Sequence, residues 1–394
     1  MKTTRKLANL PPYLFAQIDA TVATRRKGGQ KILELSKSDP EHATPPDIVA
    51  ELQLRASDAA NHHYPDFDGI LELRQAAVAW YRAKYGVNLD PDTQVLPLLG
   101  SKEGIVHICE AFIDSGDIAL IPDPAFPSYR TGTLLAEGQV FPMPLLPANN
   151  YLPDFNRIPT DIARQAKLMF LNYPNNPTGA VASPEFFATA VKYARENDII
   201  LLHDHAYSQT TFNGYTSPSL LQTPGALDLG IEFFTFSKAF NMAGWRLGLA
   251  LGNAAIIRGL KTIETHVNAG IFAPIQYAGA KALAMGPEHS FFHSMNTNYA
   301  RRLAKVVEFF NRKGWQLKVP HGTVYAWVPC PRGYNSVDFT TLLLEEAGVA
   351  VSPGIGFGEQ GDNHVRICVT YPDTEVEDAL ARIEQCLDKH ALRP

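Results

Sequence analysis

The sequence predicts an α/β protein with a largely parallel sheet covered by helices, followed by a smaller α+β region. Two observations support this prediction. From about residue 47 onward, short apolar runs alternate with longer helical patterns, as in βαβ units. The apolar runs are nearly continuous rather than alternating, which is typical of parallel strands buried on both faces.

The expected elements follow in order along the chain. Strands are predicted in TQVLPLLG, DIALIPDP, KLMFLNYP, DIILLHDHAY and EFFTFSK, and helices in SKEGIVHICEAFIDSG and SPEFFATAVKYAREN. From about residue 286 the pattern changes to a long amphipathic helix, HSMNTNYARRLAKVVEFFNRKG, and then to YAWVPCP, the helix FTTLLLEEAG, the strands VAVSP and VRICVTY, and the helix EVEDALARIEQCLDKHAL.

The chain is expected to divide into a large and a small domain, because 394 residues exceed one ordinary core. We assign residues 47–285 to the large domain, 286–394 to the small domain, and 1–46 to an N-terminal segment that joins the small domain. The sequence contains no internal repeat, low-complexity segment or flexible linker, so we expect the domains to pack closely. Active sites commonly lie at such a junction.

The composition indicates an ordinary globular protein, with 45% apolar residues, 19% charged residues and a net charge of -5. This balance gives no reason to expect nucleic acid as a partner. No window approaches the roughly 20 apolar residues of a membrane span. The four cysteines form no CxxC pair and no signal sequence precedes them, so we expect a cytoplasmic protein with reduced thiols.

The chemistry is predicted at the carboxyl ends of the strands, where an open parallel sheet binds its ligand. Lys238 directly follows an apolar strand, where a charged amine costs desolvation energy unless it is paired or its pKa falls. Arg246 lies eight positions further on, in GWRLG. A lysine nucleophile and an arginine that can bind phosphate suit a Schiff base to a phosphorylated aldehyde cofactor.

Two further strand ends offer binding groups. In LLGSKEG a strand ends at Gly100, and Ser101 and Lys102 open a helix whose free N–H groups and positive dipole end can bind an anion. In DPAFPSY the ring of Phe126 is placed to stack on a flat cofactor. A plain glycine turn with a serine cap and a simple core aromatic explain these two segments equally well.

Two more strand ends carry polar side chains. In LNYPNNPTG a rigid turn can aim the Asn176 amide into a cleft, although turn propensity alone also accounts for it. In LLHDHAY, Asp204 ends a strand and Tyr207 follows; a buried carboxylate there needs a cationic partner such as a protonated ring nitrogen. His203 and His205 raise the alternative of a metal, but strand alternation puts them on the face opposite Asp204, so we predict no metal site.

The predicted small domain adds Arg366, a lone basic residue in the apolar strand NHVRICVT. Bidentate capture of a substrate carboxylate explains its placement, and a structural ion pair is the alternative. Nearby, Gly356, Gly358 and Gly361 spell GxGxxG, but they lead into a strand rather than a helix. They are therefore not a dinucleotide-binding fingerprint.

Together these segments resemble the fold-type I, pyridoxal-phosphate-dependent aminotransferases of class I/II over nearly the whole chain, with a sheet of the seven-stranded type. The resemblance implies that Lys238 forms the Schiff base with pyridoxal 5'-phosphate and moves the substrate proton. It implies that Asp204 keeps the pyridine nitrogen protonated, that Tyr207 and Asn176 bind the phenolic oxygen, and that Phe126 stacks on the ring.

The same resemblance implies a phosphate site and a shared active site. The residues that would hold the phosphate are Ser101, Lys102, Thr235, Ser237 and Arg246. Tyr64, in HHYPDFDGILELR, matches a tyrosine that reaches the phosphate of the neighbouring subunit, which implies a homodimer. Arg366 and Asn176 would bind the substrate α-carboxylate. Ser38, in LSKSDP, stands where relatives have a glycine whose backbone touches that carboxylate, so this loop departs from the family pattern.

Within the family, GSKEG, NMAGWRLG and HVNAGIFAPIQ look most like the LL-diaminopimelate aminotransferases and their aspartate- and alanine-using relatives. The expected activity is reversible transamination between an L-amino acid and a 2-oxo acid such as 2-oxoglutarate. A C–S β-lyase is the alternative on the same scaffold, and a ligand-sensing regulatory domain is a distant one, because no helix-turn-helix pattern is present. Candidates for reading the substrate side chain are Tyr13, Phe15, Lys37, Lys102, His266, Asn268 and Tyr325.

Overall fold

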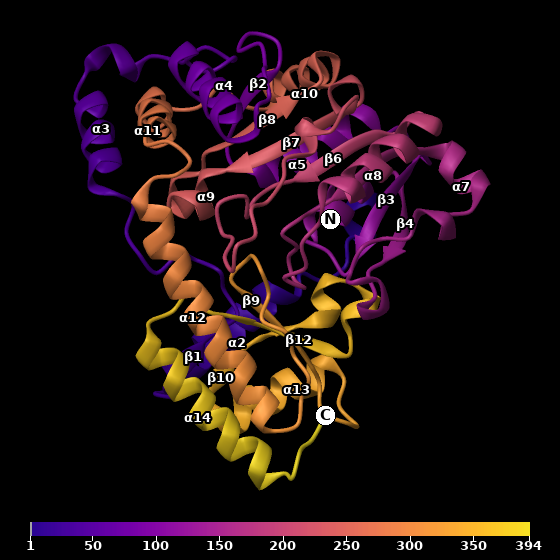
Figure 1. The fold of residues 1–394 in the computed structure, drawn as a ribbon, viewed down its shortest axis with the longest axis vertical. Helices are drawn as coiled ribbons and strands as arrows, with labels where there is room; N and C mark the ends of the chain where they lie inside the picture. The colour runs from indigo at the N-terminus through magenta and orange to yellow at the C-terminus, as the bar shows by residue number, and fades with distance from the viewer. Residues whose placement is uncertain (1) are drawn as a thin grey trace.

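A computed structural model describes residues 2–394 (Figure 1). Its main feature is a seven-stranded sheet in the order β2-β8-β7-β6-β5-β3-β4. The strands are β2 (Val95–Leu98), β3 (Ile118–Asp123), β4 (Gln139–Pro144), β5 (Ala166–Leu171), β6 (Ile200–Asp204), β7 (Gly230–Thr235) and β8 (Gly248–Gly252). All neighbours are parallel except β8, which runs antiparallel to β2 and β7. The predicted α/β class with a mostly parallel sheet is confirmed.

The sheet is buried on both faces because consecutive side chains point to opposite sides of a strand. On β5, Leu168 and Phe170 pack in a cluster with α5 and α10, whereas Met169 and Leu171 pack on the other face with α8. This arrangement explains the continuous apolar runs of the sequence.

Helices cover the sheet and flank it at the β2 edge. They are α3 (Pro46–Ala56), α4 (Leu71–Tyr85), α5 (Ser101–Phe112), α6 (Ser128–Leu135), α7 (Thr160–Gln165), α8 (Pro184–Glu196), α9 (Phe236–Ala239), α10 (Ala254–Val267) and α11 (Ala273–Ala284). α11 packs against both α3 and α4 (Figure 1). Three helices, α5, α6 and α9, start shortly after β2, β3 and β7, so their N-terminal ends lie near the edge where the parallel strands finish.

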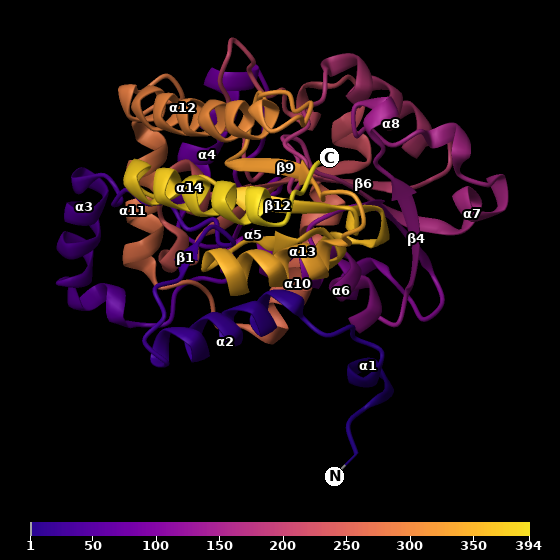
Figure 2. The same ribbon diagram turned by 90° about the horizontal axis from the view of Figure 1, so that it is seen from below.

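The remaining elements form a second layered unit at the other end of the molecule (Figures 1 and 2). Its three-stranded antiparallel sheet has the order β11-β12-β9, and a separate parallel pair joins β1 to β10. The strands are β1 (Leu33–Glu34), β9 (Tyr325–Pro329), β10 (Val349–Ala350), β11 (Ser352–Pro353) and β12 (His364–Cys368), and the helices are α2 (Leu14–Lys27), α12 (Ser290–Arg312), α13 (Ser336–Leu342) and α14 (Asp373–Lys389). In Figure 2, α12 lies beside β9 and α14, which it contacts.

Two details differ from the sequence-based elements. VAVSP is not one strand, because the chain divides at Val351: β10 pairs with β1, whereas β11 pairs with β12. In addition, residues 139–144 and 248–252, for which the sequence predicts no strand, form β4 and β8. Both are edge or antiparallel members of the sheet, and glycines and prolines interrupt their apolar patterns.

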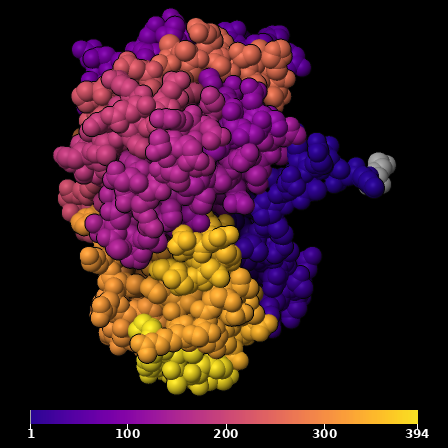
Figure 3. Space-filling view, turned by 90° about the vertical axis from the view of Figure 1, so that its right-hand side faces the viewer, coloured from indigo at the N-terminus to yellow at the C-terminus, as the bar shows by residue number. Residues whose placement is uncertain are grey.

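The N-terminal residues carry the short helix α1 (Arg5–Ala8), which projects from the body of the molecule in Figure 3. From residue 10 the chain returns along the second unit through α2 and β1. Within residues 2–394, no helix combines the length and the apolar character needed to cross a membrane.

Candidate active site

A cavity of about 460 Å³ opens between the carboxyl ends of the large sheet and the second unit. It brings together every residue predicted to bind the cofactor or the substrate carboxylate except Tyr64. The lining residues from the prediction are Ser38, Ser101, Lys102, Phe126, Asn176, Asp204, Tyr207, Thr235, Ser237, Lys238, Arg246 and Arg366. These residues are spread over more than 300 positions of the sequence, and the sheet topology gathers them at one edge.

Lys238 lies in the short helix α9, directly after β7. Thr235 caps this helix by accepting a hydrogen bond from the Ser237 N–H at 3.2 Å. The Lys238 ammonium donates to the carbonyl oxygen of Ser38 at 2.6 Å and to its hydroxyl at 3.2 Å. Burial lowers the pKa of Lys238 to about 8, which raises the share of neutral, nucleophilic amine near pH 7.

Asp204 ends β6 and offers an unsatisfied acceptor to the cavity. Its Oδ2 accepts a hydrogen bond from the Tyr129 hydroxyl at 2.8 Å, whereas its Oδ1 is buried without a hydrogen-bond partner. Asn172 fixes the strand end by donating to the Asp204 carbonyl at 2.7 Å. Burial raises the pKa of Asp204 to about 6. A cationic N–H donor would both satisfy Oδ1 and favour the ionised carboxylate.

An anion cradle is formed where α5 begins. Gly100 has a φ of +86°, and a Cβ there would lie 2.6 Å from Nη2 of Arg246. A Cβ on Gly248 would likewise meet the backbone nitrogen of Ser101 at 2.6 Å. Only glycine therefore allows the guanidinium and the first turn of α5 to approach so closely. The combination of a helix N-terminus and an arginine suits a phosphate group.

Arg366 extends from β12 and is buried, with 6% of its surface exposed. It donates to Asn176 Oδ1 at 2.8 Å and to the carbonyl oxygen of Ser36 at 2.7 Å. Its Nε is buried without a partner. No carboxylate of the described residues lies within salt-bridge distance of Arg366, so the ion-pair alternative fails and the guanidinium retains its charge for an incoming carboxylate.

Some predicted residues make contacts that the sequence did not indicate. The Lys102 ammonium lies 5.2 Å from the ring centroid of Tyr13, where it makes a cation–π contact. Ser38 contacts Lys238 through both its carbonyl and its hydroxyl. Tyr64 lies outside the cavity with 89% of its surface exposed. The glycine run after β11 forms two 3₁₀ turns and leads into β12, so the structure agrees that it is not a strand–helix dinucleotide motif.

The candidates for side-chain recognition separate into two groups. Tyr13, Phe15, Lys37, Lys102 and Tyr325 line the cavity. His266 and Asn268 do not, because they lie at the end of α10, where Asn268 donates to Glu264 at 2.6 Å.

Two residues that contact the site, and a third that lies behind it, are not among the predicted residues. Tyr129 and Asn172 both bind Asp204, and both occur in segments that were singled out, DPAFPSY and LNYPNNPTG. Glu232 lies in the apolar strand EFFTFS, and a single carboxylate in such a strand is the sequence feature that could have identified it. The hydrogen-bond partners of such groups depend on which strands lie next to them, so no local sequence pattern identifies these partners.

A buried polar network occupies the face of β6 opposite the cavity. The Glu232 carboxylate accepts from five donors: Tyr81 Oη, His203 Nδ1, His205 Nδ1, Ser219 Oγ and Leu220 N. Both histidines therefore lie on the side opposite Asp204, as strand alternation predicts. Their ligand atoms and a Glu232 oxygen lie within 4.8 Å of one another. Direct hydrogen bonds already satisfy these atoms, and the absence of a metal stays a prediction.

This network predicts acid sensitivity. Burial lowers the pKa of His205 to about 4, from an ordinary value of 6.5, so on acidification the unfolded chain takes up a proton before the folded chain does. Stability should therefore fall as the pH drops from about 6.5 to about 4, by on the order of 3 kcal/mol. Burial alone would raise the pKa of Glu232, but the histidines hold it well below its usual range, so its protonation removes further stability at lower pH still.

Denaturant unfolding across this pH range measures the effect. His205→Asn should flatten the dependence of the unfolding free energy on pH, because the titrating group is gone. His293→Asn, on an exposed position of α12, is the matched control and should leave the slope unchanged. Equal slopes in the two variants and the unmodified chain would contradict the assignment.

The site is thus built for covalent amine chemistry on a phosphorylated ring cofactor, which places the protein among transferases of α/β fold. The chain belongs to the class I and II aminotransferases, and the model of that family matches residues 30–383. It is 46% identical to an LL-diaminopimelate aminotransferase of Moorella thermoacetica over 99% of both chains, and 43% identical to one of Dehalococcoides mccartyi over 97% of this chain and 98% of the other.

Solved structures agree with this family. Substrate-bound BacF from Bacillus subtilis superposes with a TM-score of 0.94 at 36% identity, covering 100% of this chain and 98% of the other. A double mutant of Thermus thermophilus aspartate aminotransferase gives a TM-score of 0.92 at 26% identity, covering 98% of this chain and 100% of the other. The protein is an aminotransferase that uses pyridoxal 5'-phosphate.

The cavity fits this cofactor. The unpaired Oδ1 of Asp204 matches a protonated pyridine nitrogen, and the cradle of Gly100, Ser101 and Arg246 matches a phosphate. Lys238, with its lowered pKa, matches the aldehyde.

Proposed function

We propose that this chain transfers the amino group of LL-diaminopimelate, or of a related L-amino acid such as aspartate or alanine, to a 2-oxo acid such as 2-oxoglutarate. The observation that supports the reaction most directly is the placement of Lys238, the unpaired Asp204 Oδ1 and Arg366 in one cavity. The substrate assignment rests on the names of the relatives that are more than 40% identical along nearly the full chain.

Each residue has a proposed task. Pyridoxal phosphate, when bound, supplies an electron sink for the negative charge that develops on the substrate Cα. Asp204 keeps the ring nitrogen protonated, and Tyr207 and Asn176 donate to the ring oxygen. Ser101, Lys102, Thr235, Ser237 and Arg246 hold the phosphate, and Phe126 covers the ring. Arg366 and Asn176 bind the α-carboxylate beside Ser38, while Lys238 removes and returns the Cα proton.

An absorbance experiment tests the proposal. The purified protein is mixed with one amino acid at a time, and loss of the visible band reports the first half of transamination. We expect LL-diaminopimelate to act faster than aspartate, glutamate, alanine or methionine. Equal rates with all five would contradict the substrate assignment. Release of pyruvate and ammonia from cystathionine, without transfer to 2-oxoglutarate, would favour a C–S β-lyase instead.

Arg366→Ala should raise KM for every amino acid and 2-oxo acid by about 10²-fold or more, because it removes a charged, bidentate contact to the carboxylate that all of them share. Steady-state kinetics with a long and a short substrate measure the change. Lys102→Ala, which alters a cavity residue outside this contact, should not raise KM uniformly. If KM of the Arg366→Ala variant rose for only one substrate, Arg366 would recognise the substrate side chain rather than the shared carboxylate.

We further propose a homodimer in which Tyr64 reaches the active site of the neighbouring subunit. In the single chain the Tyr64 side chain is almost fully exposed, and Phe67, Leu71, Val267 and Phe272 are also exposed apolar residues. The backbone around Gly270 packs against Pro65, so the segments that carry these side chains lie together. An exposed apolar surface of this kind is typical of an interaction face.

Subunit mixing tests this arrangement. Lys238→Ala and Tyr64→Ala homodimers are expected to have little activity, but a mixed dimer contains one site with an intact Lys238 and an intact Tyr64. Mixing after mild dissociation should therefore restore up to about one quarter of the unmodified activity, by random pairing. No recovery, with mixed dimers demonstrated by mass spectrometry, would remove Tyr64 from the partner's site.

Two general assignments are also proposals. The pairing of β1 with β10 supports residues 1–46 as a segment that joins a small domain of residues 286–394, apart from a large domain of residues 47–285. The four free cysteines, three of them buried, support a reducing, cytoplasmic location.

A further inference from the structure

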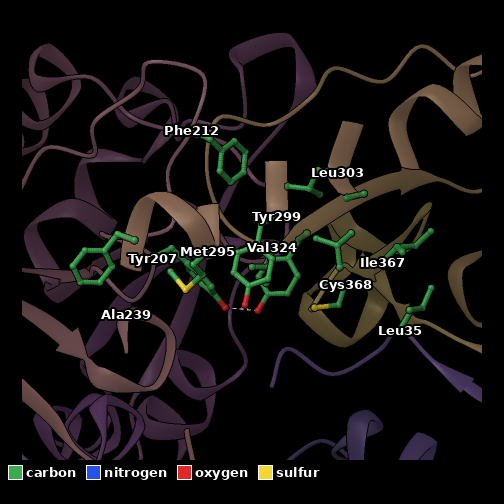
Figure 4. Packing of buried hydrophobic residues seen from close by; sticks show 14 of the residues in the cluster. Leu35, Tyr207, Phe212, Ala239, Met295, Tyr299, Leu303, Val324, Ile367 and Cys368 are labelled. Atoms are coloured by element: carbon green, nitrogen blue, oxygen red, sulfur yellow. Dashed lines mark hydrogen bonds between the residues drawn. The ribbon is translucent and has the colours of Figure 1, made fainter. Parts of the chain in front are cut away.

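Two buried tyrosines from different sheets share a hydrogen bond at the cavity. Tyr207 follows β6 of the seven-stranded sheet, and Tyr325 begins β9 of the three-stranded sheet. Their hydroxyl groups are hydrogen-bonded, as the dashed line from the Tyr207 hydroxyl in Figure 4 shows. The two side chains are 4% and 1% exposed, and both line the cavity. The pair therefore links the two sheets at the site itself.

Tyr325 also contacts the proposed carboxylate-binding arginine. The guanidinium carbon of Arg366 lies 4.3 Å from the centroid of the Tyr325 ring. The antiparallel pairing of β9 with β12 sets this contact, since Tyr325 lies opposite Cys368 and Arg366 lies opposite Trp327. One face of the ring is thus held by Arg366 while its hydroxyl meets Tyr207. Tyr325 therefore contacts both the arginine proposed to bind the substrate carboxylate and the tyrosine proposed to bind the cofactor ring.

The number of protons decides what the pair can do. Each phenol has one proton to donate and an oxygen that accepts. In a bond between two hydroxyls, the donor uses its only proton, and the acceptor keeps its own for a third group. Burial raises the pKa of both phenols, and the Arg366 charge offsets part of the rise for each. The guanidinium lies over the ring of Tyr325, and a cation at that position favours Tyr325 as the donor.

We propose that Tyr325 is a positioning residue for Tyr207: its hydroxyl donates to the Tyr207 oxygen, so that the Tyr207 proton is directed at the ring oxygen of pyridoxal phosphate. Accepting this bond polarises the Tyr207 hydroxyl and makes it a stronger donor. It also fixes the Tyr207 ring, whose plane lies at 76° to that of Tyr325. The inference rests on the proposed role of Tyr207 as a donor to that oxygen.

The test is the pH titration of the visible absorbance of the holoenzyme. A hydrogen bond to the ring oxygen stabilises the deprotonated form, so a weaker bond raises the midpoint. Tyr207→Phe should raise the midpoint by about one unit or more, and Tyr325→Phe by about half a unit. In the Tyr207→Phe background, Tyr325→Phe should add nothing, because its effect passes through Tyr207. Phenylalanine at position 325 keeps the ring beneath Arg366, so the fold is preserved.

Tyr299→Phe is the matched control. Tyr299 is buried in the same hydrophobic cluster, but the hydroxyl bonded to Tyr207 is that of Tyr325 and not that of Tyr299. Its removal should leave the midpoint unchanged. Equilibrium dialysis of the cofactor gives a second readout: Tyr325→Phe should weaken binding by less than Tyr207→Phe, since it removes no direct contact.

The outcomes separate this inference from the role on which it rests. A shift in Tyr207→Phe with none in Tyr325→Phe overturns the positioning role and leaves that of Tyr207 intact. Equal shifts from Tyr325→Phe in both backgrounds overturn it as well, because Tyr325 then acts independently. No shift in Tyr207→Phe overturns the proposed role of Tyr207 and this inference together.

Discussion

Lys238→Ala is expected to lose all measurable transamination and the visible absorbance of the bound cofactor. The reason is chemical: the Lys238 amine lies in the cavity directly after β7, and burial lowers its pKa to about 8. The loss removes both the covalent attachment of the cofactor and the group that moves the Cα proton. Absorbance spectra and single-turnover assays with an amino donor measure the two effects.

A second lysine provides the control for this prediction. Burial lowers the pKa of Lys84 to about 7, but its amine donates to the Ser208 carbonyl and to Gln209 Oε1 outside the cavity. Lys84→Met should therefore keep the visible band. Borohydride reduction of the holoenzyme, followed by peptide mass analysis, should label the peptide that contains Lys238 and not the one that contains Lys84. A labelled Lys84, or turnover in Lys238→Ala at the unmodified rate, would contradict the mechanism.

Asp204→Ala is expected to bind the cofactor but to lose about 10³-fold or more in rate. Without a carboxylate opposite the ring nitrogen, the nitrogen is no longer held in its protonated form, and the negative charge that develops on Cα loses its stabilisation. The phosphate cradle around Arg246 is unaffected, so binding persists. Equilibrium dialysis and single-turnover rates separate these two effects.

Tyr129→Phe serves as a graded comparison. It removes one of the hydrogen bonds that favour the ionised Asp204 carboxylate, at 2.8 Å, but leaves the carboxylate itself in place. The expected loss of rate is about tenfold, far smaller than for Asp204→Ala. A cofactor analogue with a methylated ring nitrogen, which is permanently cationic, should recover part of the rate in Asp204→Ala. A small loss in Asp204→Ala, similar to that of Tyr129→Phe, would show that Asp204 is not the partner of the ring nitrogen.

Much of the large sheet was predictable because its strands are buried on both faces. Runs such as LMFL and IILL are apolar throughout, and helices with clear patterns separate them. β4 and β8 were harder to predict from the sequence, because prolines and glycines shorten their apolar patterns. Each forms a strand only through hydrogen bonds to its neighbours in the sheet. VAVSP was assigned as one strand, but Val351 marks the point where the chain passes from the β1 pair to the β12 sheet.

The sequence by itself determined the reaction class: a lysine, a carboxylate and an arginine at the ends of apolar strands are local features, and desolvation makes each of them conspicuous. The tertiary structure alone decided their partners. Hydrogen bonds between distant segments of the sequence join Tyr129 to Asp204, Glu232 to both histidines, and Tyr325 to Tyr207. Such pairs depend on strand order and on the approach of two sheets, which are set by the packing of the whole chain rather than by any local pattern.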